Sequence, residues 1–145
     1  MKVAYFLDLP TPQYLWLLHK SLKRARKMMP DCEYILCTTN EFPELDMPID
    51  TYVRIDGSEN KEPGYRKALA FSRIEGDCLF LDVDTVVQRS VAHIFNDASF
   101  DICLAIRYRS KLIDKIPFNS GVAFTRVPQF WKDVAGRPDQ HKCLA

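Results

Sequence analysis

Glycine is scarce in this sequence of 145 residues, which has five, and no two lie close enough for a Gly-rich phosphate loop. This excludes the P-loop and the dinucleotide-binding fingerprint. Neither sign of charge dominates, since 20 Lys and Arg face 19 Asp and Glu, whereas general nucleic-acid binders usually carry a large basic excess. Long apolar runs are also missing. The first run, residues 3–7, is too short for a signal peptide or a transmembrane segment.

The cysteines are few, and their number and spacing do not indicate disulfide bonds or a metal site. The count is five, which is odd, and no C-x-x-C pair occurs. Cys37, Cys78 and Cys103 lie inside apolar runs, where a free thiol behaves as a small hydrophobic side chain. We therefore expect a protein of a reducing compartment, that is, a cytoplasmic one.

The remaining composition is that of one globular domain. Hydrophobic residues make up 47% and charged residues 27% of the chain. Apolar runs predict strands at residues 3–7, 34–38, 52–55, 78–81, 101–106 and 118–124. Helical spacing and start signals predict helices at 13–29, 63–74, 90–95 and 127–135. This order predicts an α/β fold with a mainly parallel sheet and flanking helices, formed by residues 1–145 as a single domain.

The first predicted helix has a basic outer face, made by Lys20, Lys23, Arg24 and Lys27. Such a stripe is typical of a solvated helix surface. A membrane or phosphate surface is the alternative.

The most informative segment is Leu79-Phe80-Leu81-Asp82-Val83-Asp84-Thr85. Ligands of open parallel sheets bind outside the carboxyl ends of strands, where these two acids lie. If the backbone stays extended, Asp82 and Asp84 point the same way and can share one Mg²⁺ or Mn²⁺. The alternative is a strand-ending turn with two solvated acids.

Two chemistries use this pattern of acids. One is the D-x-D of nucleotide-sugar-dependent glycosyltransferases, and the other is the D-x-D-x-T of haloacid-dehalogenase-like phosphatases, with Asp82 as the nucleophile. The phosphatase motif normally sits on the first strand, whereas here only 60 residues follow Thr85 and none of them forms a D-D or G-D-x-x-x-D motif. The position therefore favours the glycosyltransferase.

Three segments carry a family likeness in the same order along the chain. They are residues 67–95 around the D-x-D motif, Pro117-Phe118-Asn119-Ser120-Gly121-Val122, and Asp139-Gln140. In these segments the chain resembles retaining glycosyltransferases of the glycogenin and bacterial lipopolysaccharide galactosyltransferase type (glycosyltransferase family 8). The resemblance implies the Rossmann-like GT-A nucleotide-diphospho-sugar transferase fold. It also implies a metal-dependent hexosyltransferase that moves a sugar from a nucleotide-diphosphate donor, expected to be a UDP-sugar, to a glycan, lipid or protein acceptor.

The resemblance implies roles for the residues around the metal and the nucleotide. Asp82 and Asp84 would hold Mn²⁺ or Mg²⁺ against the donor diphosphate. Lys67, or Arg66 as the alternative, would neutralise phosphate or touch the sugar, because a helix directs only one of two neighbours toward the site. Asp8 would meet the base or ribose. The residues expected to contact the donor are Asp8, Arg66, Lys67, Val83, Ser120 and Gly121.

The resemblance also implies residues at the sugar. Asn119 would contact it, with Ser120 and Gly121 allowing close approach. Asp139 and Gln140 would face the anomeric carbon. Retention of configuration is implied by the resemblance alone.

The chain departs from the family at its end, because it lacks the H-x-x-G-x-x-K-P-W segment whose histidine completes the metal site. His19, His93 and His141 match no part of that segment. We expect a metal site with two protein ligands and a donor-binding domain that is C-terminally short. The alternative function is a non-catalytic nucleotide-sugar-binding remnant.

Overall fold

The computed structural model describes residues 1–39, 45–56, 62–96, 99–106 and 118–137. In this part of the chain, six strands form one sheet with the order β3-β2-β1-β4-β6-β5. The strands are β1 (Lys2–Phe6), β2 (Glu33–Thr39), β3 (Thr51–Ile55), β4 (Cys78–Leu81), β5 (Ile102–Ile106) and β6 (Phe118–Thr125). Only β6 runs against its two neighbours, so the prediction of a mainly parallel sheet is confirmed.

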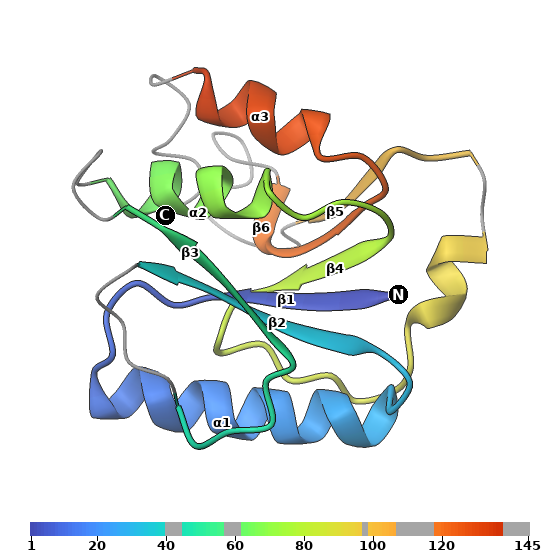
Figure 1. The fold of residues 1–145 in the computed structure, drawn as a ribbon. Coiled ribbons are helices and arrows are strands. Elements are labelled where there is room, and N and C mark those ends of the chain that lie inside the picture. Colours follow the sequence, from blue (N-terminus) through green and yellow to red (C-terminus); the bar gives the residue numbers. More distant parts are fainter. Residues whose placement is uncertain (40–44, 57–61, 97–98, 107–117, 138–145) are drawn as a thin grey trace.

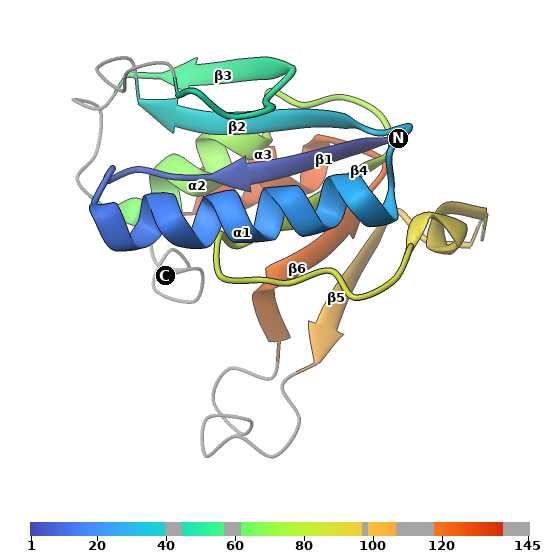
Figure 2. The same cartoon turned by 90° about the horizontal axis from the view of Figure 1, so that it is seen from below.

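The helices cover the two faces of this sheet unequally (Figure 1). The helices are α1 (Pro12–Met28), α2 (Pro63–Phe71), the 3-10 helix η1 (Ala92–Asn96) and α3 (Gln129–Ala135). Helix α1 lies alone across one face, while α2 and α3 lie side by side on the other. The connection after β4 runs on the α1 side of the sheet (Figure 2). The α/β prediction with flanking helices is therefore confirmed.

Helix α1 begins at a sequence that is typical of helix starts. The Thr11 hydroxyl accepts a hydrogen bond from the Tyr14 N–H at 3.3 Å, and Pro12 occupies the first turn, where its missing N–H is not needed. Leu18, Leu22 and Ala25 recur at helical spacing and are buried on the sheet.

Helix α2 is shorter than predicted. It ends at Phe71 with Ser72 as its C-cap, because from Arg73 on the N–H groups bond only three residues back: Arg73 to Ala70 and Ile74 to Phe71. Gly76 follows with a φ of 79°, a conformation that glycine adopts without strain.

An aromatic cluster fastens α2 and α3 to the sheet. The Phe71 ring lies 4.2 Å from Phe80 and 5.1 Å from Trp131, measured between centroids. All three side chains are fully buried. Since α2 carries the predicted cations Arg66 and Lys67, this packing sets where their side chains can reach.

Strands β1 and β4 are parallel neighbours in register, with Tyr5 opposite Leu81. Their carboxyl ends therefore lie side by side, and the acids that follow them are brought to one edge of the sheet.

Four cysteines in the described residues are free thiols, namely Cys32, Cys37, Cys78 and Cys103. Burial raises the pKa of both the Cys37 and Cys78 thiols, which keeps them protonated. Within the described ranges, no helix combines the length and apolar character needed to span a membrane.

Candidate functional site

The two acids of the D-x-D motif lie on a turn. Strand β4 ends at Leu81, and the Asp82 N–H donates to the Gly121 carbonyl of β6 at 2.9 Å. The Thr85 N–H then bonds back to the Asp82 carbonyl at 3.0 Å. The backbone after β4 is therefore not extended. The prediction that Asp82 and Asp84 point the same way assumed an extended backbone, and this assumption is wrong. The Asp82 side chain is 41% exposed, and Asp84 is exposed.

Both cations of α2 reach this edge of the sheet. The Lys67 ammonium lies 2.5 Å from a carboxylate oxygen of Asp82, and the Arg66 guanidinium pairs with the Asp8 carboxylate. The expectation that only one of the two would face the site is wrong. Neighbouring side chains on a helix diverge, but here two adjacent strand ends each present an acid to one of them.

The end of β1 is held firmly beside β2. The Leu7 N–H donates to the Cys37 carbonyl at 3.0 Å, and the Thr38 hydroxyl donates to the Leu7 carbonyl at 2.8 Å. Asp8 follows directly, and its side chain is only 12% exposed. These hydrogen bonds fix the backbone just before Asp8, and so they position its carboxylate beside Arg66.

A pocket of about 210 Å³ opens beside Asp8. Its lining consists of Phe6, Leu7, Asp8, Leu9, Tyr14, Pro63 and Val83. Asp8 and Val83 were expected at the donor from the family resemblance, whereas Tyr14 and Pro63 were not expected. Tyr14 lies in the first turn of α1, and Pro63 lies in the first turn of α2. The two residues are far apart in the sequence, so no local pattern indicates that they line one pocket.

A chain of hydroxyls anchors the turn after β4. The Ser21 hydroxyl contacts both the Thr85 carbonyl and the Tyr5 hydroxyl, the latter at 3.0 Å. A serine has one proton, and a carbonyl can only accept, so Ser21 donates to Thr85 and Tyr5 donates to Ser21. Burial, as the larger influence, raises the pKa of Tyr5 to about 12, which keeps this donor protonated. The sequence offered no signal for Ser21, since a polar residue on a buried helix face is visible only once its partners are known.

The β6 segment borders the same edge, because Leu81, the last residue of β4, lies opposite Val122 of the antiparallel strand β6. The Gly121 carbonyl accepts from the Asp82 N–H and, at 3.3 Å, from the Thr85 hydroxyl. The backbone of Asn119 pairs with Ala105 of β5, while the side chains of Asn119 and Ser120 lie outside what the structure describes. Asp139 and Gln140 lie outside the described residues altogether.

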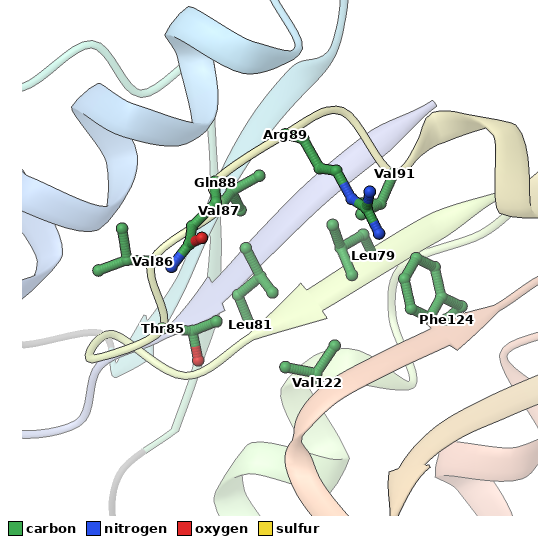
Figure 3. A pocket seen from close by; sticks show the side chains of 10 residues that line it. All are labelled: Leu79, Leu81, Thr85, Val86, Val87, Gln88, Arg89, Val91, Val122 and Phe124. Carbon is green, nitrogen blue, oxygen red and sulfur yellow. The ribbon is translucent and has the colours of Figure 1, made fainter.

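A second, larger pocket of about 240 Å³ lies on the α1 side of the sheet (Figure 3). The connection from Thr85 to Val91 runs over Leu79, Leu81, Val122 and Phe124, which form apolar walls. Arg89 is the charged residue of its lining. With no acid in that lining, this pocket does not match the chemistry of the strand ends.

Comparison with solved structures assigns the fold. The structure of the galactosyltransferase LgtC, solved with donor and acceptor sugar analogs, is similar to this chain with a TM-score of 0.69 and 14% sequence identity. The match covers 100% of this chain and 66% of the LgtC chain. The glycosyltransferase GlyE of Streptococcus pneumoniae TIGR4 matches 92% of this chain over 36% of its own (TM-score 0.64, 16% identity). The bifunctional glycosyltransferase WbbM matches 99% over 34% (TM-score 0.61, 8% identity). The chain has the GT-A glycosyltransferase fold.

The likeness is one of structure alone. No protein-family model matches the sequence, and no curated protein matches it either. The chain spans 66% or less of the length of these three solved chains. At such identities the GT-A fold is established, and the chemistry must be argued from the site.

The acids of this GT-A fold suit a hard divalent cation that also holds phosphate. Asp82 and Asp84 offer two carboxylates at one turn, and Mg²⁺ is commonly bound by one or two carboxylates together with water and substrate phosphates. No cluster of three or more His, Cys, Asp or Glu side chains that could hold a metal occurs among the described residues.

Proposed function

We propose that this chain is a metal-dependent glycosyltransferase domain that binds a nucleotide-diphosphate sugar, expected to be a UDP-sugar. The observation that carries the proposal is the cluster of charges at the adjoining ends of β1 and β4. Two acids are paired there with two cations of α2, and Asp84 and the pocket of about 210 Å³ lie beside them. This arrangement supports a ligand that has an apolar ring at one end and a diphosphate next to it.

The pocket beside Asp8 is the proposed place of the nucleoside. Phe6, Leu7 and Tyr14 supply apolar and aromatic walls for a base, and Asp8 supplies a carboxylate that can accept hydrogen bonds from the base or ribose. Val83 joins this pocket to the D-x-D turn, so the diphosphate would follow the nucleoside toward Asp82.

The diphosphate is where charge must be balanced during transfer. Cleaving the bond between sugar and phosphate leaves negative charge on the diphosphate and oxocarbenium character on the sugar. Lys67 would exchange the Asp82 carboxylate for a diphosphate oxygen, and Arg66 would add its field from beside Asp8. Asp82 and Asp84 would hold Mn²⁺ or Mg²⁺, which when bound stabilises the charge of the leaving group.

The sugar end rests on residues whose side chains the structure does not describe. Asn119 would contact the sugar, with Ser120 and Gly121 permitting close approach, and Asp139 and Gln140 would face the anomeric carbon. These roles, like retention of configuration, follow from the family resemblance. The acceptor would be a glycan, a lipid or a protein.

A calorimetric titration with UDP, with and without Mn²⁺, tests the proposal. We expect UDP to bind only with the metal, and we expect Asp82→Asn/Asp84→Asn to abolish that binding. Asp31→Asn/Asp77→Asn is the matched control, because both of these acids are exposed and lie at the amino end of the sheet. Metal-independent binding, or equal losses in both double variants, would overturn the proposal.

Release of UDP from UDP-glucose and UDP-galactose in the same solution separates an enzyme from a non-catalytic binding module. Metal-dependent release that both Asp82→Asn and Asp84→Asn remove indicates catalysis. Binding without release supports the module. The phosphatase alternative predicts hydrolysis of small phosphate esters lost in Asp82→Asn, and the GT-A fold gives it no support.

A further inference from the structure

Helix α1 carries an unusual distribution of charge. Its 17 residues include five cations and no acid, which leaves 15 basic against 19 acidic residues in the rest of the chain. In a chain of nearly zero net charge, α1 is therefore a locally basic element. That helix lies on the face of the sheet opposite to α2 and α3 (Figure 1).

The cations form a stripe opposite the buried face of α1. With about 3.6 residues per turn, Trp16, Lys20, Lys23 and Lys27 fall on one line, and all four are exposed. The buried residues Leu18 and Leu22 lie on the other side of the helix. We call Trp16, Lys20, Lys23 and Lys27 the outer stripe.

The lysines of the outer stripe make no ion pair with an acid in the part of the chain that the structure describes. Arg26, beside the stripe, pairs with Asp50 at 2.6 Å. The stripe therefore presents its three positive charges to whatever lies outside.

The aromatic member distinguishes this stripe from an ordinary solvated helix face. Trp16 is 59% exposed, and the Lys20 ammonium lies 5.6 Å from the centroid of its ring. Leu9 and Tyr14, near the same end of α1, are 62% and 45% exposed. Exposed indole and apolar side chains next to lysines are typical of surfaces that bind the headgroup region of a bilayer.

We propose that α1 docks this protein on an anionic membrane surface, with the lysines against lipid phosphates and Trp16 at the headgroup level. The inference does not depend on the proposed glycosyltransferase activity. Tyr14 also lines the pocket beside Asp8, so docking through α1 would bring that pocket close to the bilayer.

Vesicle binding by the full chain tests the proposal, because its two tryptophans report separately. Trp131 is fully buried and Trp16 is exposed, so a blue shift and protection from acrylamide on adding vesicles report on Trp16. We expect both changes with phosphatidylcholine vesicles that contain phosphatidylglycerol, and neither with phosphatidylcholine alone. Binding should weaken as salt is added.

Lys20→Gln/Lys23→Gln/Lys27→Gln should weaken binding on the order of a hundredfold, since each lysine near an anionic surface contributes about fivefold. Arg73→Gln/Lys132→Gln/Arg137→Gln removes the same charge from exposed positions in or just after α2 and α3, on the other face of the sheet, and should change affinity much less. Trp16→Ala should weaken it severalfold with all charges kept. Circular dichroism checks the fold of each variant.

Three results would overturn the proposal. They are equal binding to neutral and anionic vesicles, equal losses in the two triple variants, and binding to double-stranded DNA that exceeds vesicle binding while Trp16 stays open to acrylamide. The last would show a polyanion surface instead. Because salt dependence and Trp16 shielding are measured on the unaltered chain, the test stands even if a variant misfolds.

Discussion

Two ion pairs stand side by side at the carboxyl edge of the sheet, and they differ in how much water reaches them. In the pair at the end of β1, the side chains of Asp8 and Arg66 are 12% and 13% exposed. In the pair at the end of β4, Lys67 is 7% exposed, but Asp82 is 41% exposed. The first pair has both charges enclosed, and the second has one charge open.

The difference assigns different tasks to the same chemistry. A carboxylate enclosed with its guanidinium joins α2 to β1 and would be costly to separate. The Asp82 carboxylate is exposed and can therefore contact another ligand. Until a ligand binds, the buried Lys67 ammonium balances the charge of this carboxylate. Asp82, not Asp8, is therefore the acid we expect a metal and a diphosphate to reach.

The largest expected effect separates these two pairs by stability. Arg66→Met should lower the free energy of unfolding by about 3 kcal/mol, because the Asp8 carboxylate stays enclosed, at 12% exposure, without this guanidinium. Lys67→Met should cost less than about 1 kcal/mol, since the Asp82 carboxylate that it leaves behind is 41% exposed and stays hydrated. Urea denaturation measures both. Equal losses would show that exposure does not distinguish the pairs.

Alkaline pH should break the link between the two strand ends at Tyr5. Burial raises the pKa of Tyr5 to about 12, while an unfolded chain ionises tyrosine near pH 10. The folded state therefore holds this proton longer. Its contribution is fully present below about pH 10 and falls by about 2 to 3 kcal/mol as pH approaches 12.

Urea denaturation repeated from about pH 9 upward should show this decline. Tyr5→Phe should show a smaller slope, although burial also raises the pKa of Tyr34 and of the Cys37 and Cys78 thiols, which will leave part of the decline. An unchanged slope in Tyr5→Phe would contradict the assignment to Tyr5.

Removal of the hydroxyl between the strand ends should have a smaller effect. Ser21→Ala should cost about 1 to 2 kcal/mol, because the Thr85 carbonyl and the Tyr5 hydroxyl lose their shared partner. It should also weaken Mn²⁺-dependent UDP binding severalfold by loosening the turn that carries Asp82.

Ser72→Ala is the matched control for that variant, because the Ser72 hydroxyl donates only within α2, to the Leu69 carbonyl at 2.7 Å. It should leave UDP binding unchanged. If both serine variants weaken binding alike, the hydroxyl chain does not position the turn.

The smallest effect on stability is expected at Lys67. Lys67→Met keeps the buried stem and removes the charge, and the exposed Asp82 carboxylate regains water, so unfolding should change by less than about 1 kcal/mol. UDP affinity should nevertheless fall about tenfold, for loss of one charged contact to phosphate. Calorimetry checks this, and Lys67→Arg should retain more affinity than Lys67→Met. Unaltered affinity in Lys67→Met would remove Lys67 from the donor site.

Most of the fold was predictable from local patterns. The strand at 78–81 has the predicted bounds, and the other strands and α1 differ by one or two residues. The end of α2 was misplaced because Ile74 continues the apolar spacing and is buried, although the backbone has already tightened. Apolar spacing reports burial, not hydrogen bonding, so it cannot locate such an end.

Several candidate residues could be named from the sequence and the family resemblance, and their roles stay a prediction, whereas their contacts could not be named. Asp8, Arg66, Lys67 and Asp82 were all named from the sequence, and the structure brings them to one edge. The contacts missed were both ion pairs and the hydroxyl chain through Ser21. Each joins residues at least 15 positions apart, which no short pattern connects.

The sequence by itself determined that this chain is an α/β domain with two acids after its most apolar strand, because burial pattern and residue type act over a few neighbouring positions. Only the tertiary structure decided that each α2 cation has an acid of its own, and that Asp82 stays open while Asp8 is enclosed. The reason is that exposure and pairing depend on which strands lie side by side and how a helix is seated on them. Packing between distant residues sets both.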